Sequence, residues 1–154
     1  MCNSIGCRDL GQDWLDLVSA RLVCAVAQDR FISVRVLLSL ADQLGFDLSV
    51  LPVPTEYGYF LVSDYLSVSR QLKNNHNRVR SRYGLTEHFT WQEWLALLKK
   101  TDWSCQFCYR SNVKLTIEHI KPLCLGGLDT IDNIAVACPE CNAARASVLN
   151  LAVV

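Results

Sequence analysis

Apolar residues recur at helical spacing along the first third of the chain. Residues 10–28 place apolar side chains three or four positions apart, which predicts an amphipathic helix. The apolar residues of this helix are Leu10, Trp14, Leu17, Val18, Leu22 and Ala25. A second apolar stretch, residues 31–44, ends at Gly45, a residue typical of helix C-termini. It predicts a second helix, with a strand as the alternative because many of its residues are β-branched.

Two short apolar runs follow, residues 48–53 and 57–62, and they flank residues 54–56. Short apolar runs bounded by Pro and Gly predict a β-hairpin. Ser63 is then expected to be the N-cap of a polar helix, residues 64–83, that Gly84 ends. Two helices before a hairpin suit a winged-helix-like DNA-binding fold or a helical support region, and we favour the support region.

Further along, Thr90 and Glu93 have the spacing of a capping box, which predicts a helix over residues 91–100. One face of this helix is apolar and carries Trp91, Trp94, Leu95 and Leu98. Because helical spacing places both tryptophans on one stripe, we expect them in the core rather than stacked on nucleic-acid bases.

The last third of the chain alternates between strand and turn signals. Within residues 113–123, the sequence predicts a strand that leads into Glu118 and His119 and that Pro122 ends. A polar, glycine-containing loop over residues 125–133 leads to a second strand, residues 134–137. A proline and a glutamate then suit the first turn of a helix that reaches about residue 149.

Composition fits a soluble protein with an ordinary core. The chain has 154 residues, of which 51% are apolar, enough for one domain or two small ones. No apolar run reaches the roughly 18 residues needed to span a bilayer. The N-terminus lacks a basic start and a continuous apolar stretch, so no secretory signal is expected. We predict a cytoplasmic protein without a membrane partner.

Charge is distributed unevenly although the net charge is zero. Residues 1–69 hold four basic and eight acidic residues, residues 70–100 hold seven and two, and residues 101–154 hold four and five. The middle segment is therefore the expected contact for a polyanion. Its run of five basic residues without an acidic one is Arg70, Lys73, Arg78, Arg80 and Arg82. On a helix these would contact a phosphate backbone, or would simply be a solvated face.

Eight cysteines are many for a chain of this length, and four of them form two Cys-x-x-Cys pairs. The paired residues are Cys105, Cys108, Cys138 and Cys141, whereas Cys2, Cys7, Cys24 and Cys124 show no such pairing. In a cytosolic protein, paired cysteines bind metal more often than they form disulfides. Four thiolates complete a tetrahedral Zn²⁺ site and leave no open position, so the zinc is structural and any catalytic group lies between the pairs.

The residues between the pairs resemble the HNH endonuclease family. The resemblance covers about residues 90–147 and includes a Glu-His-Ile sequence, Pro-Leu, Gly-Gly, Asp-Asn-Ile, and a final Cys-Asn with a basic residue three places on. It implies an α+β fold: a C-terminal ββα-metal domain with structural zinc, after a mainly helical region with a possible β-hairpin. We place the N-terminal region at residues 1–84 and the nuclease domain at residues 85–154.

The resemblance also implies roles for individual residues. His119 stands at the position of the general base that activates water, and Glu118 at the acidic metal ligand. Asn133 stands where an asparagine braces the loop and so orients the histidine. Asn142 stands where a side chain helps to bind the catalytic metal, which oxygen ligands suggest is Mg²⁺ or Mn²⁺. Arg145 shares a helix face with Asn142, and it either clamps a phosphate or is a solvated charge.

Two positions depart from the family pattern. Glu118 replaces the commoner aspartate, which lengthens the side chain by one methylene and can shift the position of the metal. Cys124 stands where relatives usually carry a small polar residue. The remaining histidines, His76 and His88, lack a motif around them, and we expect both on the surface.

The sequence therefore predicts a metal-dependent endonuclease acting on DNA, with RNA as the other candidate substrate. One alternative is a zinc-stabilised nucleic-acid-binding module without catalysis. It would need neither the Glu118-His119 pair nor the two asparagines, Asn133 and Asn142. A further alternative is an interaction adaptor in which residues 1–69 are the functional part.

Overall fold

The computed structural model describes residues 10–151, with side chains for residues 14–147. The chain divides into two compact units at Arg70 and Gln71. This point lies inside the longest described helix, α3 (Val62–Tyr83). The domain boundary expected after residue 84 lies just beyond the end of that helix and stays a prediction. Within the described part, no helix is both long and apolar enough to cross a bilayer.

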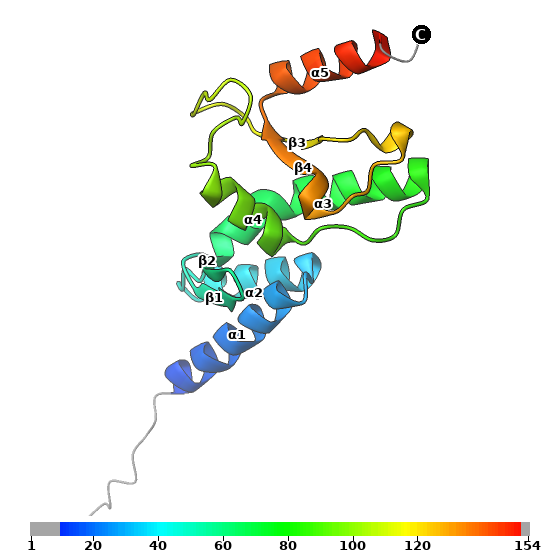
Figure 1. Cartoon of the computed structure of the whole chain (residues 1–154). Helices are drawn as coiled ribbons and strands as arrows, with labels where there is room; N and C mark the ends of the chain where they lie inside the picture. The colour runs from blue at the N-terminus through cyan, green and yellow to red at the C-terminus, as the bar shows by residue number, and fades with distance from the viewer. Residues whose placement is uncertain (1–9, 152–154) are drawn as a thin grey trace, which may run out of the picture. The chain divides into compact units, whose positions relative to one another are not determined.

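The first unit begins with two helices, α1 (Leu10–Ala27) and α2 (Phe31–Gln43), drawn in blue and cyan in Figure 1. Both predicted helices are confirmed, and the strand alternative for the second is wrong. The helices pack against each other through buried residues such as Leu22, Val26 and Val34. Their burial on facing stripes stabilises helices that would be marginal alone.

The predicted hairpin is present, but its turn lies further along the chain. Strands β1 (Pro52–Thr55) and β2 (Gly58–Leu61) pair antiparallel. Pro54, expected in the turn, lies within β1 opposite Tyr59. The Thr55 hydroxyl accepts a hydrogen bond from the Tyr57 N–H and donates one to the Gly58 carbonyl. These bonds and the positive φ of Gly58, 96°, fix the turn at residues 56–57 instead of 54–56.

Helix α3 begins one residue earlier than its expected cap. Ser63 lies in its first turn, so the prediction that Ser63 is the N-cap is wrong. Instead, the carboxylate of Asp64 accepts a hydrogen bond from the Leu61 N–H at 2.8 Å, which satisfies a donor at the helix start. The end is as predicted, because Gly84 has a φ of 69° and donates to the Arg80 carbonyl.

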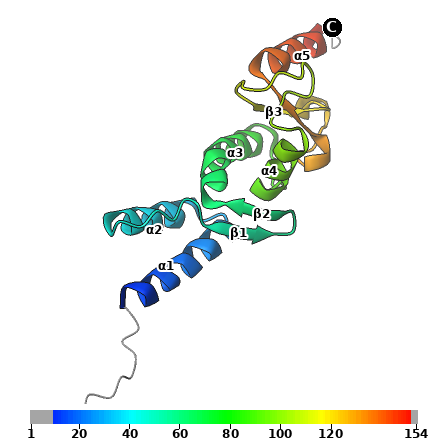
Figure 2. The ribbon, with the colours of Figure 1, turned by 90° about the vertical axis from the view of Figure 1, so that its left-hand side faces the viewer.

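The second unit contains the predicted capping-box helix α4 (Trp91–Lys100) and a ββα arrangement. Strands β3 (Thr116–His119) and β4 (Ile134–Ala137) pair antiparallel, and α5 (Pro139–Leu151) packs beside them (Figure 2). Two short 3₁₀ turns, Leu123–Leu125 and Ile131–Asn133, lie in the loop between the strands. The tryptophans of α4 are buried, as expected. The predicted mixed α and β fold is confirmed.

Candidate active site

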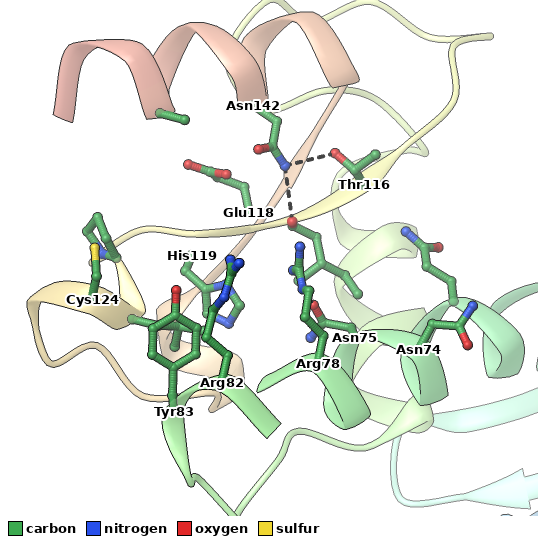
Figure 3. Close-up of a pocket in the computed structure, with 15 residues that line it drawn as sticks. Asn74, Asn75, Arg78, Arg82, Tyr83, Thr116, Glu118, His119, Cys124 and Asn142 are labelled. Carbon is green, nitrogen blue, oxygen red and sulfur yellow. Dashed lines mark hydrogen bonds between the residues drawn. The ribbon is translucent and has the colours of Figure 1, made fainter. Parts of the chain in front are cut away.

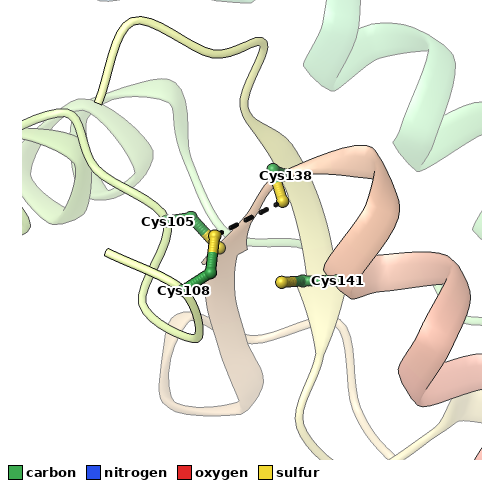
Figure 4. Close-up of side chains that lie close together, drawn as sticks. All are labelled: Cys105, Cys108, Cys138 and Cys141. Carbon is green, nitrogen blue, oxygen red and sulfur yellow. Dashed lines mark hydrogen bonds between the residues drawn. The ribbon is translucent and has the colours of Figure 1, made fainter. Parts of the chain in front are cut away.

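Four cysteine side chains meet in the second unit (Figure 4). Cys105 and Cys108 lie in the loop after α4, Cys138 follows β4, and Cys141 lies in the first turn of α5. Their Sγ atoms all lie within 4.8 Å of one another, and those of Cys108 and Cys138 are 3.7 Å apart. Thiolates bound to one tetrahedral zinc at about 2.3 Å are about 3.8 Å apart. The predicted clustering is therefore confirmed, and the cluster fits a structural zinc.

Arg110 adds a positive charge to this cluster that the sequence motif did not indicate. Its guanidinium lies 3.4 Å from the sulfur atoms of both Cys108 and Cys138, and 3.2 Å from the Glu140 carboxylate. Hydrogen bonding from Arg110 lowers the pKa of Cys108 to about 6. The guanidinium thus favours the thiolate form that zinc needs.

Two further cysteines of the described residues take no part in the cluster. Cys24 and Cys124 are exposed and form no disulfide. Cys2 and Cys7 lie outside the described residues.

Asn133 ties together the two ends of the loop between β3 and β4. Its side-chain oxygen accepts from the Lys121 N–H at 2.8 Å, and its amide nitrogen donates to the carbonyls of Lys121 and Leu128 at 3.0 and 2.7 Å. Its backbone carbonyl accepts from the Ile120 N–H. These bonds hold the chain directly after His119, as expected for a bracing asparagine.

Glu118 and Asn142 present oxygen atoms on neighbouring elements, β3 and α5. The Asn142 amide nitrogen donates to Thr116 Oγ1 and to the Ile117 carbonyl, both at 3.1 Å (Figure 3). A carbonyl can only accept, so the amide nitrogen must face Ile117 and the Asn142 oxygen is left for another partner. Glu118 is buried, with a relative exposure of 8%. A carboxylate and an amide oxygen form a donor set that suits a hard divalent ion.

Arg145 is the cation that Glu118 contacts in this structure. Its Nε lies 3.2 Å from a Glu118 carboxylate oxygen, and its guanidinium lies 4.5 Å from the centre of the Phe107 ring. The side chain is therefore not a freely solvated charge. The predicted phosphate contact would require Arg145 to release Glu118 at least in part.

A cavity of about 550 Å³ lies between β3, α5 and the second half of α3 (Figure 3). Glu118, His119 and Asn142 line it, as does Cys124. Helix α3 contributes a polar wall, formed by Gln71, Asn74, Asn75, Arg78, Arg82 and Tyr83. Of the five basic residues predicted to contact nucleic acid, Arg78 and Arg82 line the cavity, and Arg70, Lys73 and Arg80 do not.

Asp129 is the site residue that sequence reasoning missed. Its carboxylate is fully buried and lies 2.7 Å from His119 Nε2 and 2.7 Å from His88 Nδ1. Burial opposes its ionisation, but hydrogen bonds from His119 and His88 outweigh that effect and hold the pKa of Asp129 below its usual value. The only sequence signal is an acidic residue just after the Gly-Gly turn.

The expectation that His76 and His88 lie on the surface is wrong. Their side chains are 19% and 9% exposed, and the two rings stack with centroids 4.5 Å apart. Both face Asp129, because the end of α3 and the loop before α4 converge on the β3–β4 loop. This convergence could not be predicted from the sequence, since no short-range motif surrounds either histidine.

Donor atoms of His76, His88 and Asp129 lie within 4.8 Å of one another, a spacing compatible with a metal ion. The ring geometry argues against a shared ion. A histidine binds metal in the plane of its ring, and these ring planes are stacked at an angle of only 11°, so one ion cannot lie in both. We therefore interpret the cluster as a hydrogen-bonded group around the carboxylate.

Comparison with known proteins agrees with this geometry in the C-terminal part. The family model described as HNH endonuclease matches residues 105–147, which contain both cysteine pairs, β3, β4 and the start of α5. No curated protein and no solved structure matches the chain.

Proposed function

We propose, from the premise that residues 105–147 are an HNH endonuclease domain, that the protein is a metal-dependent endonuclease that hydrolyses phosphodiester bonds in DNA. The observation that carries the proposal is that Glu118, His119 and Asn142 line one cavity with two arginines. Imidazole, oxygen ligands and guanidinium groups are the groups that hydrolysis of a phosphodiester requires together. As an HNH domain, the second unit has a nucleic-acid substrate, and DNA is our choice over RNA.

His119 is the proposed general base. Its side chain is 10% exposed and lines the cavity, so a water molecule beside a bound phosphate can reach it. Neutral imidazole accepts a proton near pH 7, which suits removal of a proton from the attacking water. Asn133 contributes indirectly, because its hydrogen bonds hold the backbone that follows His119.

Glu118 and Asn142 are the proposed ligands of a catalytic Mg²⁺ or Mn²⁺. When bound, the ion would place positive charge beside the negative charge that develops on the phosphate. Asn142 is prepared for this role because its nitrogen is occupied by Thr116 and Ile117, which leaves its oxygen available. Once Glu118 binds a cation, Arg145 is free to contact a phosphate oxygen instead.

Helix α3 is the proposed docking surface for the nucleic-acid backbone. Arg78 and Arg82 line the cavity and would contact phosphates near the scissile bond. Arg70, Lys73 and Arg80 lie on the same helix outside the cavity lining, and they would contact phosphates further along the strand. The support role of the first unit and the cytoplasmic location of the protein stay predictions.

The test is incubation of supercoiled plasmid with the purified protein and a panel of divalent ions. We expect nicked or linear product with Mg²⁺ or Mn²⁺. His119→Ala should lower the rate by roughly 10²- to 10⁴-fold, the usual contribution of a general base, while zinc content stays unchanged. Cleavage by His119→Ala at the parent rate would refute the assignment of the base.

The same experiment separates the alternative of a binding module without catalysis. That alternative predicts salt-dependent binding of the plasmid and no product with any divalent ion. A set of products that depends on both the divalent ion and His119 would exclude it.

A further inference from the structure

The carboxylate of Asp129 accepts a hydrogen bond from a different histidine on each oxygen, and His76 Nε2 lies 4.0 Å from Oδ2. Oδ1 lies 2.7 Å from His119 Nε2, and Oδ2 lies 2.7 Å from His88 Nδ1. The Asp129 side chain has no exposed surface, so water does not compete for either contact. Both distances are those of short, charge-assisted hydrogen bonds.

An ionised carboxylate only accepts hydrogen bonds, which fixes where the protons are on both rings. The facing nitrogen of each histidine must carry a hydrogen. Neutral His119 is therefore protonated at Nε2, and its lone pair is on Nδ1. Since His119 lines the cavity, Nδ1 is the ring nitrogen left to accept a proton there.

His88 leaves the charge of Asp129 uncancelled. Its second nitrogen, Nε2, is buried and has no hydrogen-bond partner among the described residues. A proton on that nitrogen would be a buried, unpaired donor, so the geometry disfavours a second proton on His88. It orients the carboxylate with one hydrogen bond, and the negative charge stays available to His119.

The backbone holds Asp129 in place as well. The Phe89 N–H donates to the Asp129 carbonyl at 2.9 Å, immediately before the capped start of α4. The Asn75 amide of α3 lies 3.5 Å from Oδ1. Asp129 is thus fixed from α3, from the loop before α4 and from its own loop.

From these contacts we propose that Asp129 is a positioning residue for His119: it selects the Nε2–H tautomer, holds the ring so that Nδ1 faces the cavity, and stabilises the imidazolium that forms when Nδ1 takes the proton from water. The catalytic part of this inference rests on the proposed function. In this step the water proton moves to Nδ1 of His119, and the Nε2 proton stays between His119 and Asp129.

The direct test is nitrogen NMR of the zinc-loaded wild-type protein labelled at histidine. We expect the neutral form of the His119 ring to show a protonated Nε2 and an unprotonated Nδ1, with its signals assigned by their loss in His119→Gln. A neutral His119 ring protonated at Nδ1 would overturn the proposal, whether or not the protein cuts DNA.

The matched variants are Asp129→Asn and Asp132→Asn. In Asp129→Asn the new side-chain amide would offer one acceptor and one donor, so it could not accept from both histidines, and the tautomer of one must change. We expect Asp129→Asn to shift the His119 signals and to lower kcat by about 10²-fold or more with KM and zinc content unchanged, by analogy with the triad aspartate of serine proteases. Asp132 is exposed on the same loop, and Asp132→Asn should match the wild type.

The outcomes distinguish the two proposals. An Asp129→Asn protein with unchanged kcat would overturn the positioning role and leave the nuclease assignment intact. Absence of cleavage by the wild type with every divalent ion would instead refute the proposed function, while the wild-type nitrogen spectrum would still decide the tautomer. If Asp129→Asn does not fold, that spectrum alone carries the test.

Discussion

At Gly127 the loop between β3 and β4 passes so close to its other side that no side chain fits. A Cβ atom there would lie 2.0 Å from the Lys121 carbonyl oxygen and 2.9 Å from the Asn133 amide nitrogen. Both neighbours belong to the bracing network that follows His119. The requirement for glycine is therefore one of space, since Gly127 itself has no positive φ.

We expect Gly127→Ala to lower the free energy of unfolding by about 1–3 kcal/mol, the usual cost of overpacking a rigid site. Because the displaced atoms hold the backbone next to His119, the cleavage rate should fall as well. Thermal unfolding and plasmid cleavage measure the two effects. An unchanged unfolding temperature would mean that Lys121 moves aside without cost.

The motif residues were predictable because each sits in a short local signature. Glu118 and His119 end a strand, and Asn142 directly follows the last cysteine of the second Cys-x-x-Cys pair. Asp129 has no such signature, because its partners His119, His88 and Asn75 are 10, 41 and 54 positions away. Only the folded chain brings these four side chains together.

At the scale of elements, apolar periodicity predicted α1 and α2, because burial of one face dominates helix stability in proteins. Signals at the helix ends, such as the capping box and Gly84, predicted α3, α4 and α5. The misplaced boundaries were decided by single side chains. Asp64 satisfies the start of α3, and Thr55 fixes the hairpin turn. Such hydrogen bonds depend on local backbone geometry, which the pattern of apolar residues does not encode.

Helix α3 allows the effect of position on nucleic-acid contact to be tested, because its arginines carry the same charge and differ only in whether they line the cavity. Arg82 lines the cavity, whereas Arg80 on the same helix does not. We expect Arg82→Ala to weaken DNA binding more than Arg80→Ala and to lower the cleavage rate as well. Each lost phosphate contact should reduce the salt slope of binding by about 1.

Binding titrations at several salt concentrations measure this difference, with Arg30→Ala as a control for loss of an exposed arginine from the first unit. Equal effects of the Arg80 and Arg82 variants on both binding and cleavage would mean that the cavity wall contacts DNA no more closely than the rest of α3.

For the molecule as a whole, the cysteine cluster joins two segments of the second unit that are far apart in the sequence. The first cysteine pair lies on the loop after α4, and the second joins β4 to α5. Strands β3 and β4 have only four residues each, and an isolated pair of strands is marginal in water. Metal binding at such a site contributes directly to the free energy of folding.

Removal of zinc by a strong chelator should therefore unfold the ββα part and abolish cleavage even when Mg²⁺ is present. Cys141→Ser should act in the same direction by removing one ligand. Zinc release, circular dichroism and plasmid cleavage follow the change, and added Zn²⁺ should restore the chelated protein. Full activity in a zinc-free protein would contradict the structural role.

Deletion of residues 1–69 asks which unit carries the function. The division at Arg70 and Gln71 leaves the cavity wall of α3, the histidine cluster and the zinc cysteines together in the second unit. Residues 70–154 should therefore bind one zinc and retain plasmid nicking, at a reduced rate if the remaining part of α3 frays without the residues before it. A fragment that folds, holds zinc and cuts nothing would show that the first unit is needed for the reaction, and an adaptor role for that unit would then gain support.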